Sequence, residues 1–325
     1  MTSASPLNSA FVELAVTTRS GRDESLHFGA VVILGKDGSI ETALGDSAVV
    51  IYPRSSNKPM QATAMASRGL ALPPRLLALV CGSHDGLPEH IAGTREILST
   101  VNLTEQSLRN TPDLPLNSKA AEEVLRNGGS RSPVQMNCSG KHAGMLATCM
   151  HNNWTHDESY LQFDHPLQRH ITETIQDLAG EQVDHIGVDG CGAPAHAFSL
   201  AGLARAFRAI VMSSDGSPAG SVASAMRAHP QMVGGPTRDV TLLMQGIPGL
   251  MAKDGADGVF AAALPDGRAV ALKISDGANR ARSPVMKAAL QILGVDLSAV
   301  DPRAFASPIF GHGKPVGEVR VIADF

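Results

Sequence analysis

The chain has few cysteines, few aromatic residues and no long apolar run. Its 325 residues include four cysteines, one tryptophan and two tyrosines. Four cysteines are too few for a disulfide scaffold in a chain of this length. No apolar stretch approaches the roughly 18 residues of a membrane-spanning helix, and the N-terminus lacks the basic and apolar regions of a signal peptide. We therefore expect reduced cysteines and a cytoplasmic location.

The chain also lacks a strong charge of either sign. Its formal net charge of −4 gives no electrostatic reason to expect binding to nucleic acid or to a membrane surface. Hydrophobic residues make up 43% and charged residues 18%, a composition that excludes disorder and indicates a soluble globular protein. A chain of this length can bury a sizeable core.

The hydrophobic pattern places strands at both ends of the chain and helices between them. Strands are predicted over residues 10–16, 27–34, 39–44, 259–264, 269–274 and 317–323. Helices are predicted over residues 60–67, 89–98, 120–126, 142–151, 167–178, 200–212 and 284–293. The simplest arrangement is an α/β (α+β) fold in a single domain, 1–325. Both chain ends would form one mixed or antiparallel sheet, with a helical subdomain at roughly 60–215 and a flexible loop at 213–220.

A serine and a lysine stand three residues apart at a predicted helix start, in the segment Arg54-Ser55-Ser56-Asn57-Lys58-Pro59. Residues at this spacing share one helical face, so Lys58 could hold its amine near the Ser55 hydroxyl. A desolvated lysine whose pKa has fallen can take the proton of a serine and make it a nucleophile. Because Ser-x-x-Lys is common by chance, the alternative is a serine N-cap beside a solvated lysine.

Two further segments carry polar groups among glycines. Residues 81–86, Cys-Gly-Ser-His-Asp-Gly, follow an apolar run and would present the Ser83 hydroxyl with little steric cover; the alternative is a polar turn. Residues 253–258, Lys-Asp-Gly-Ala-Asp-Gly, could follow the edge of a cleft with Lys253 pointing in; the alternative is a surface turn. Ser83 and Lys253 can be paired only if the fold brings the two segments together.

Thiols occur beside other metal-binding side chains in two places. Cys138, Lys141 and His142 lie in one short stretch, and Asp189 and Cys191 lie in a Gly/Pro turn. The two cysteines could meet as soft ligands for zinc, and one of the other three residues would complete the site. The spacing matches no common zinc motif, so the alternative is a pair of inert buried thiols.

Taken together, these motifs resemble one family, the bacterial L-asparaginases of the rhizobial, thermolabile type. The most specific string is Cys-Ser-Gly-Lys-His-x-Gly-Met-Leu at 138–146. The resemblance also includes the segments 54–61, 253–258 and 271–277, and it covers nearly the whole chain. It implies a fold like those of the serine β-lactamases and the serine-dependent glutaminases.

The resemblance also implies a role for each motif residue. Two serine–lysine tandems fall on Ser55/Lys58 and Ser83/Lys253. A zinc site of two cysteines and a lysine falls on Cys138, Lys141 and Cys191. Residues beside the site, expected to bind substrate, are Arg54, His142 and Asp189.

The implied activity is hydrolysis of L-asparagine to L-aspartate and ammonia through a seryl acyl-enzyme. We expect Ser55 to be the nucleophile, because helix geometry fixes its lysine, and Ser83 to polarise groups or relay protons. Zinc would position the substrate or order the loops that carry its ligands. A homodimer is implied by the resemblance alone.

Two other functions stay open on the sequence. A β-lactam-interacting serine acylase would share Ser-x-x-Lys and a Lys-x-Gly strand, but no Ser-x-Asn motif stands between them. A non-catalytic zinc-binding protein would keep the thiols, but the intact serines and lysines argue against it. The sequence does not decide between asparagine and glutamine as substrate.

Overall fold

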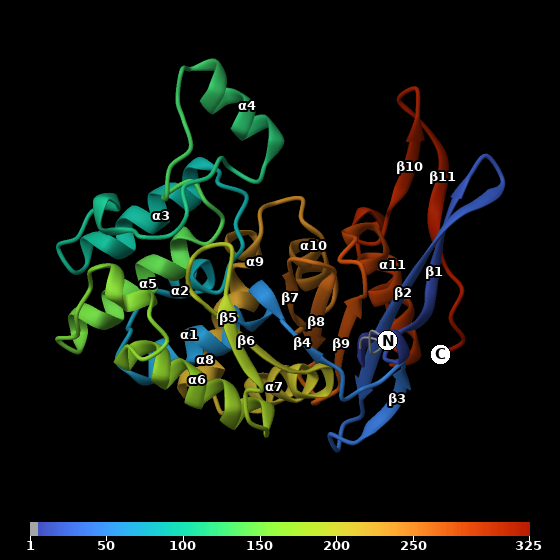
Figure 1. Ribbon diagram of the computed structural model, residues 1–325, viewed down its shortest axis with the longest axis horizontal. Helices are drawn as coiled ribbons and strands as arrows, with labels where there is room; N and C mark the ends of the chain where they lie inside the picture. The colour runs from blue at the N-terminus through green and yellow to red at the C-terminus, as the bar shows by residue number, and fades with distance from the viewer. Residues whose placement is uncertain (1–5) are drawn as a thin grey trace, which may run out of the picture.

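The computed structural model describes residues 6–325, and its main sheet is built from both ends of the chain (Figure 1). Its strands are β1 (Val12–Arg19), β2 (Arg22–Leu34), β3 (Ile40–Leu44), β7 (Met251–Gly255), β8 (Val259–Ala263), β9 (Ala269–Ile274), β10 (Pro308–Gly311) and β11 (Lys314–Val321). The order is β10-β11-β1-β2-β9-β8-β7, with β3 also paired to β2, and all pairings are antiparallel. The predicted sheet shared by both chain ends is confirmed.

The centre of this sheet is apolar on both faces. Residues 30–34 of β2 are fully buried, and the strand pairs with β9 from Gly29–Ile274 to Leu34–Ala269. A continuous apolar run of this length is typical of a strand covered on both sides. The helices α7 (Leu200–Met212) and α11 (Arg282–Ile292) pack against β9.

The remaining helices lie between β3 and β7, and Figure 1 shows them gathered beside the sheet. They are α1 (Lys58–Ser67), α2 (Pro74–Val80), α3 (Pro88–Ser99), α4 (Ser118–Arg126), α5 (Ser139–His151), α6 (Pro166–Ala179), α8 (Pro218–Ala228), α9 (Pro230–Val233) and α10 (Asp239–Gly246). Many of them begin with proline, because the backbone N–H of the first helical residue has no hydrogen-bond partner within the helix. No helix in the described part of the chain is long and apolar enough to cross a membrane.

The helical region differs from the prediction in two places. The loop predicted at 213–220 is shorter, because α8 already begins at Pro218 and Ser217 Oγ caps it by accepting from Gly220 N at 3.1 Å. The helices also run past residue 215, to Gly246. The division into a sheet and an inserted subdomain stays a prediction.

A second, small sheet was not predicted. It consists of β4 (Val50–Ile51), β5 (His185–Val188) and β6 (Pro194–Ser199), in the order β4-β6-β5. The turn between β5 and β6 carries Asp189 and Cys191, and β4 leads directly to the segment that carries Ser55. This small sheet therefore brings two of the predicted motifs together.

Candidate active site

Ser55 lies where a strand gives way to a helix. After β4, a short 3-10 turn at Arg54–Asn57 leads directly into α1 at Lys58, and Pro59 occupies the first turn of that helix. Arg54 has a φ of 53°, in the left-handed region that non-glycine residues rarely adopt. Such a conformation costs about 1–3 kcal/mol and persists only where the surroundings enforce it.

The amine of Lys58 lies on Ser83. Lys58 Nζ donates to Ser83 Oγ at 3.0 Å and also to the carbonyl oxygen of Gly82. Both side chains are buried, with 1% of Lys58 and 4% of Ser83 exposed. Across residues 6–325, neither Lys58 nor Lys253 hydrogen-bonds to Ser55. The structure thus joins the serine of one expected tandem to the lysine of the other.

The backbone around Ser83 is held against α9. Ser83 N donates to the carbonyl oxygen of Val233 at 2.8 Å. A Cβ on Gly82 would lie 2.7 Å from the Met232 carbonyl oxygen and 2.9 Å from that of Val233. Glycine is therefore required at position 82 for this close approach. The approach fixes the position of Ser83 relative to α9.

A buried chain of hydrogen bonds supports the residue after Ser83. His84 Nδ1 accepts from Gly86 N at 3.1 Å, so its Nε2 carries the proton and donates to Ser139 Oγ at 2.9 Å. Ser139 Oγ lies 3.0 Å from Thr94 Oγ1, which donates to the His90 carbonyl oxygen at 3.0 Å. Ser139 is therefore the donor to Thr94. Burial holds the pKa of His84 well below its usual value, so its imidazole stays neutral in this row of hydrogen bonds.

Lys253 lies in β7 and has no exposed surface. Its Nζ donates to Asp254 Oδ1 at 2.5 Å and to the Asp254 carbonyl oxygen at 2.7 Å. Burial lowers the pKa of Lys253 to about 8; the carboxylate of Asp254 opposes this effect, and the charge of Lys58 adds to it. An amine with this pKa is well suited to take up a proton near neutral pH.

Asp254 also binds two arginines. Its Oδ2 accepts from Arg238 at 2.6 Å and from Arg282 at 3.4 Å. Arg238 reaches Asp85 at 3.3 Å, and Arg282 reaches Asp239 at 2.5 Å. Burial would raise the pKa of Asp254, but the neighbouring lysine and the two arginines hold it well below its usual value. This buried network fixes the carboxylate that holds the Lys253 amine.

One cavity contains both serines and both arginines. Its volume is about 300 Å³, at the lower end of the range for small-molecule sites. The polar residues that line it are Ser55, Ser83, Asn137, Arg238, Asp254, Asn279 and Arg282. The segments around 55, 83, 137, 238 and 254, far apart in sequence, therefore converge on one place.

The predicted metal-binding residues form a buried cluster. Lys141 Nζ donates to Cys191 Sγ at 3.1 Å, and the Cys138 thiol donates to Asn137 Oδ1 at 3.0 Å. The neighbouring Cys138 thiol and the charge of Lys141 lower the pKa of Cys191 to about 5, against the effect of burial. Burial would lower the pKa of Lys141, but the two sulfurs and the Asp189 carboxylate raise it.

The donor set of this cluster fits zinc. Two thiolates and one further donor are typical zinc ligands, and a lysine can join them once it is neutral. Within residues 6–325, no group of three or more His, Cys, Asp and Glu side chains is arranged to hold a metal ion. A site of Cys138, Lys141 and Cys191 does not match that pattern, because one of its ligands is an amine. Zinc binding by these residues stays a prediction.

Arg54 connects this cluster to the serines. Its Nε donates to Asp189 Oδ1 at 2.8 Å, and its Nη1 pairs with Asp257. Asp189 Oδ2 lies 3.9 Å from Cys191 Sγ. The two ion pairs hold Arg54 in its strained backbone conformation. They therefore help to fix the orientation of the backbone that leads to Ser55. Arg54 lines a separate cavity of about 360 Å³ and does not line the cavity of the two serines.

His142 lies beside the thiol cluster. Its Nδ1 is 2.8 Å from Tyr160 Oη, and its Nε2 is buried without a partner among the described residues. Burial, and then the charge of Lys141, hold the pKa of His142 well below its usual value. His142 does not line the cavity of the serines, so its expected contact with substrate stays a prediction.

Sequence reasoning missed the three charged residues that line the cavity, Arg238, Arg282 and Asp254. Asp254 stands inside the Lys-Asp-Gly-Ala-Asp-Gly motif, and its position next to Lys253 was the available signal. The arginines stand in segments with no recognisable motif. Their burial, with Arg282 only 7% exposed, marks them as unusual only once the fold is known.

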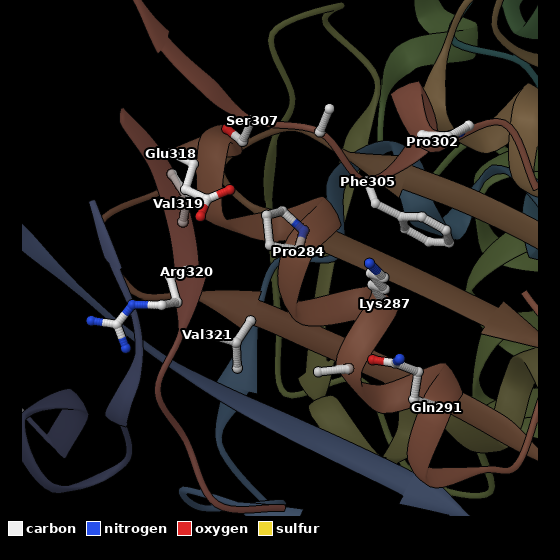
Figure 2. Close-up of a pocket in the computed structure, with 12 residues that line it drawn as sticks. Pro284, Lys287, Gln291, Pro302, Phe305, Ser307, Glu318, Val319, Arg320 and Val321 are labelled. Carbon is white, nitrogen blue, oxygen red and sulfur yellow. The ribbon is translucent and has the colours of Figure 1, made fainter. Parts of the chain in front are cut away.

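Another cavity, of about 350 Å³, lies between α11 and β11 (Figure 2). Lys287 and Gln291 from α11 line one side, and Glu318 and Arg320 from β11 line another. Lys287 Nζ lies 5.7 Å from the ring centroid of Phe305. This cavity contains none of the predicted site residues.

Several solved structures are similar to this chain. Similar solved structures include a beta-lactamase from Mycobacterium bovis, with 14% identity over 81% of this chain and 94% of that chain and a TM-score of 0.44. They also include Mglu in its native form, with 15% identity over 83% and 66% and a TM-score of 0.43. A Bacillus glutaminase has 13% identity over 82% and 91% and a TM-score of 0.34. At these TM-scores the similarities carry no part of the argument.

The evidence for the family comes from the sequence. The comparison with curated proteins found no match. The family model described as L-asparaginase II matches residues 15–321, which is nearly the whole chain. The chain therefore belongs to the L-asparaginase II family.

Proposed function

We propose that the protein is an amidohydrolase that converts L-asparagine to L-aspartate and ammonia by serine catalysis. The hydrogen bond from Lys58 Nζ to Ser83 Oγ, in the wall of a cavity that Ser55 also lines, is the observation that carries this proposal. Membership of the L-asparaginase II family supports an amidohydrolase. A cavity of about 300 Å³ suits a substrate the size of an amino acid.

In the proposed mechanism, Ser55 is the nucleophile and Lys58 is its base. Lys58 takes the hydroxyl proton, and Ser55 Oγ forms a bond to the side-chain amide carbon of asparagine. Backbone N–H groups at the start of α1 stabilise the oxyanion. Catalytic hydrogen bonds often shorten only when substrate is bound, so a resting Lys58 amine on Ser83 is compatible with this role.

Ser83 and Lys253 complete the proton transfers. Ser83 relays the proton from Lys58 to the departing nitrogen; the C–N bond breaks and ammonia leaves, with the acyl group on Ser55. Lys253, whose pKa of about 8 makes it an available base, takes a proton from the water that attacks the acyl carbon. The bond between the acyl carbon and Ser55 Oγ breaks, Lys253 passes its proton to Ser55 Oγ, and aspartate is released, so one water is consumed for each ammonia formed.

Zinc, a homodimer and a cytoplasmic location belong to the same proposal. Cys138, Lys141 and Cys191 would hold the metal. The metal would supply a fixed positive charge and would link the start of α5 to the turn between β5 and β6. All four cysteines are free and buried, which is compatible with a reducing compartment. Bound zinc measured by elemental analysis and mass measured by light scattering test the first two parts.

Ammonia release from L-asparagine is the decisive assay. We expect turnover by the wild type, loss of at least about 10³-fold in kcat for Ser55→Ala, and near-normal turnover for Ser67→Ala, a serine of α1 outside the cavity. Folded, zinc-supplied protein that releases no ammonia from asparagine or glutamine would contradict the function. Near-normal turnover by Ser55→Ala, with loss in Ser83→Ala, would instead reverse the roles of the serines. Hydrolysis of nitrocefin without asparaginase activity would favour a β-lactam hydrolase.

A further inference from the structure

We infer that Ser56 is a positioning residue, whose hydroxyl holds the backbone of Lys253 in place beside the turn that carries Ser55. Ser56 Oγ donates to the Lys253 carbonyl oxygen at 3.2 Å, between residues that are 197 positions apart in sequence. The inference rests on the proposed function, in which Lys253 is the base for hydrolysis of the acyl group on Ser55. It assigns to Ser56 a role in that second half of the reaction.

Ser56 itself is not placed to attack a substrate. It follows Ser55 directly, but it does not line the cavity. It has no exposed surface, and its hydroxyl proton is already donated to the Lys253 carbonyl oxygen. Ser55, in contrast, is partly exposed and lines the cavity. The structure therefore separates two adjacent serines: one lines the cavity, and the other binds the backbone of β7.

Strand pairing holds β7 from one side only. It is the last strand in the order of the main sheet, and its one strand neighbour is β8. The 3-10 turn at Arg54–Asn57 packs against it. The position of Lys253 relative to that turn therefore depends on contacts other than the sheet, and the Ser56 hydroxyl makes one of them.

A second close contact with the turn occurs at Gly255. A Cβ at this position would overlap the Pro53 carbonyl oxygen and would lie 2.9 Å from Ser56 Oγ. Because side chains alternate along a strand, Gly255 and Lys253 point to the same face of β7. The turn thus lies on the face of β7 that carries the Lys253 amine. Movement of β7 away from the turn would change the distance between this amine and Ser55.

The groups proposed for the first half of the reaction are held by other contacts. Lys58 Nζ donates to Ser83 Oγ, and Ser83 N donates to the Val233 carbonyl oxygen of α9. Neither hydrogen bond involves Ser56 or β7. Loss of the Ser56 hydroxyl should therefore slow the attack of water on the acyl-enzyme more than it slows formation of the acyl-enzyme.

Ser56→Ala tests the inference on the full-length enzyme. We expect the rate constant for deacylation, followed by rapid quenching and intact-protein mass spectrometry, to fall at least about tenfold, because small misplacements of a catalytic group have effects of this size. The kcat/KM for L-asparagine, which reports the steps up to ammonia release, should stay within about threefold of the wild type. Equal losses in both quantities, or no loss in either, would overturn the inference.

Gly255→Ala gives a second test at the same contact. This variant keeps the Ser56 hydroxyl, but its added Cβ should push β7 away from the turn. We expect the same selective loss of deacylation, with near-UV circular dichroism to confirm that both variants are folded. Normal deacylation in folded Gly255→Ala would show that the distance between β7 and the turn does not matter, and would overturn the inference.

Thr63→Val is the matched control. It removes a buried hydroxyl that donates to the Pro59 carbonyl oxygen within α1 at 2.9 Å, and Thr63 does not line the cavity. Both kinetic quantities should match the wild type. Deacylation as slow as in Ser56→Ala would mean that loss of any buried hydroxyl has this effect, and would overturn the inference. Failure of the proposed function would be recognised differently, because the wild type itself would release no ammonia from asparagine or glutamine.

Discussion

Replacing Asp254 by asparagine should move the pH dependence of the enzyme to lower pH. Asp254 Oδ1 lies 2.5 Å from Lys253 Nζ, and its negative charge raises the pKa of that amine against the effect of burial. An opposite charge at such a distance shifts a pKa by about 1–3 units. Without it, the pKa of Lys253 should fall from about 8 by that amount, a change of about 1.4–4 kcal/mol between its two protonation states.

The sign follows from the role of Lys253 as a base. Only the neutral amine accepts a proton, so kcat/KM should rise with pH through about 8 in the wild type. In Asp254→Asn the rise should occur at about pH 5–7. The measurement is ammonia release from L-asparagine at subsaturating concentration over pH 5–10, with near-UV circular dichroism at each pH to confirm that the protein is folded.

Asp239 provides the matched control. It binds Arg282 and Ser283 in the same network and makes no hydrogen bond to Lys253. Asp239→Asn should therefore leave the ascending limb within about 0.3 pH unit. The reasoning is refuted if Asp254→Asn leaves the limb in place or moves it upward, or if Asp239→Asn moves it equally far.

Three further predictions follow from the site. Ser139→Ala should lower the free energy of unfolding by about 1–3 kcal/mol, because it leaves a buried His84 donor without an acceptor; urea denaturation measures this, and a loss below about 0.5 kcal/mol contradicts it. Cys138→Ala should abolish stoichiometric zinc in elemental analysis, whereas Cys149→Ala, which removes a buried thiol within α5, should keep it; zinc retained by the first variant rules out the assignment. Gly82→Ala should lower kcat by at least about tenfold while the protein stays folded, since its Cβ would displace the chain at Ser83; unchanged kcat would show that this approach is not needed.

The elements that the sequence predicted best are those with strong local patterns. The helix at 200–212 and the strand at 269–274 occur with the predicted bounds, as α7 and β9. The first has apolar residues at helical spacing, and the second is an apolar run after a Pro-Asp-Gly turn. The helices α2, α9 and α10, of seven, four and eight residues, were missed because such short segments show little helical periodicity, and α8, of eleven residues, was missed as well.

The structure brings the two predicted serines to one cavity, but it pairs Lys58 with Ser83 and not with Ser55. Helical spacing suggested that Lys58 would face Ser55, yet a lysine has a long flexible stem, and its amine goes to the strongest acceptors within reach. Here these are Gly82 and Ser83, which follow α2 and which no local rule could place. Arg238 and Arg282 were invisible for the same reason: their significance depends on Asp254, to which the fold brings them.

The strand order has a consequence for synthesis of the chain. Strand β2 emerges from the ribosome early and can pair at once with β1 and β3, which are close in sequence. Its other neighbour, β9, is made only when residues 269–274 have been translated. Until then, one edge of an apolar strand stays open, and such edges are prone to pair with other chains. We expect nascent chains stalled before residue 269 to bind ribosome-associated chaperones, and to release them once β9 is complete.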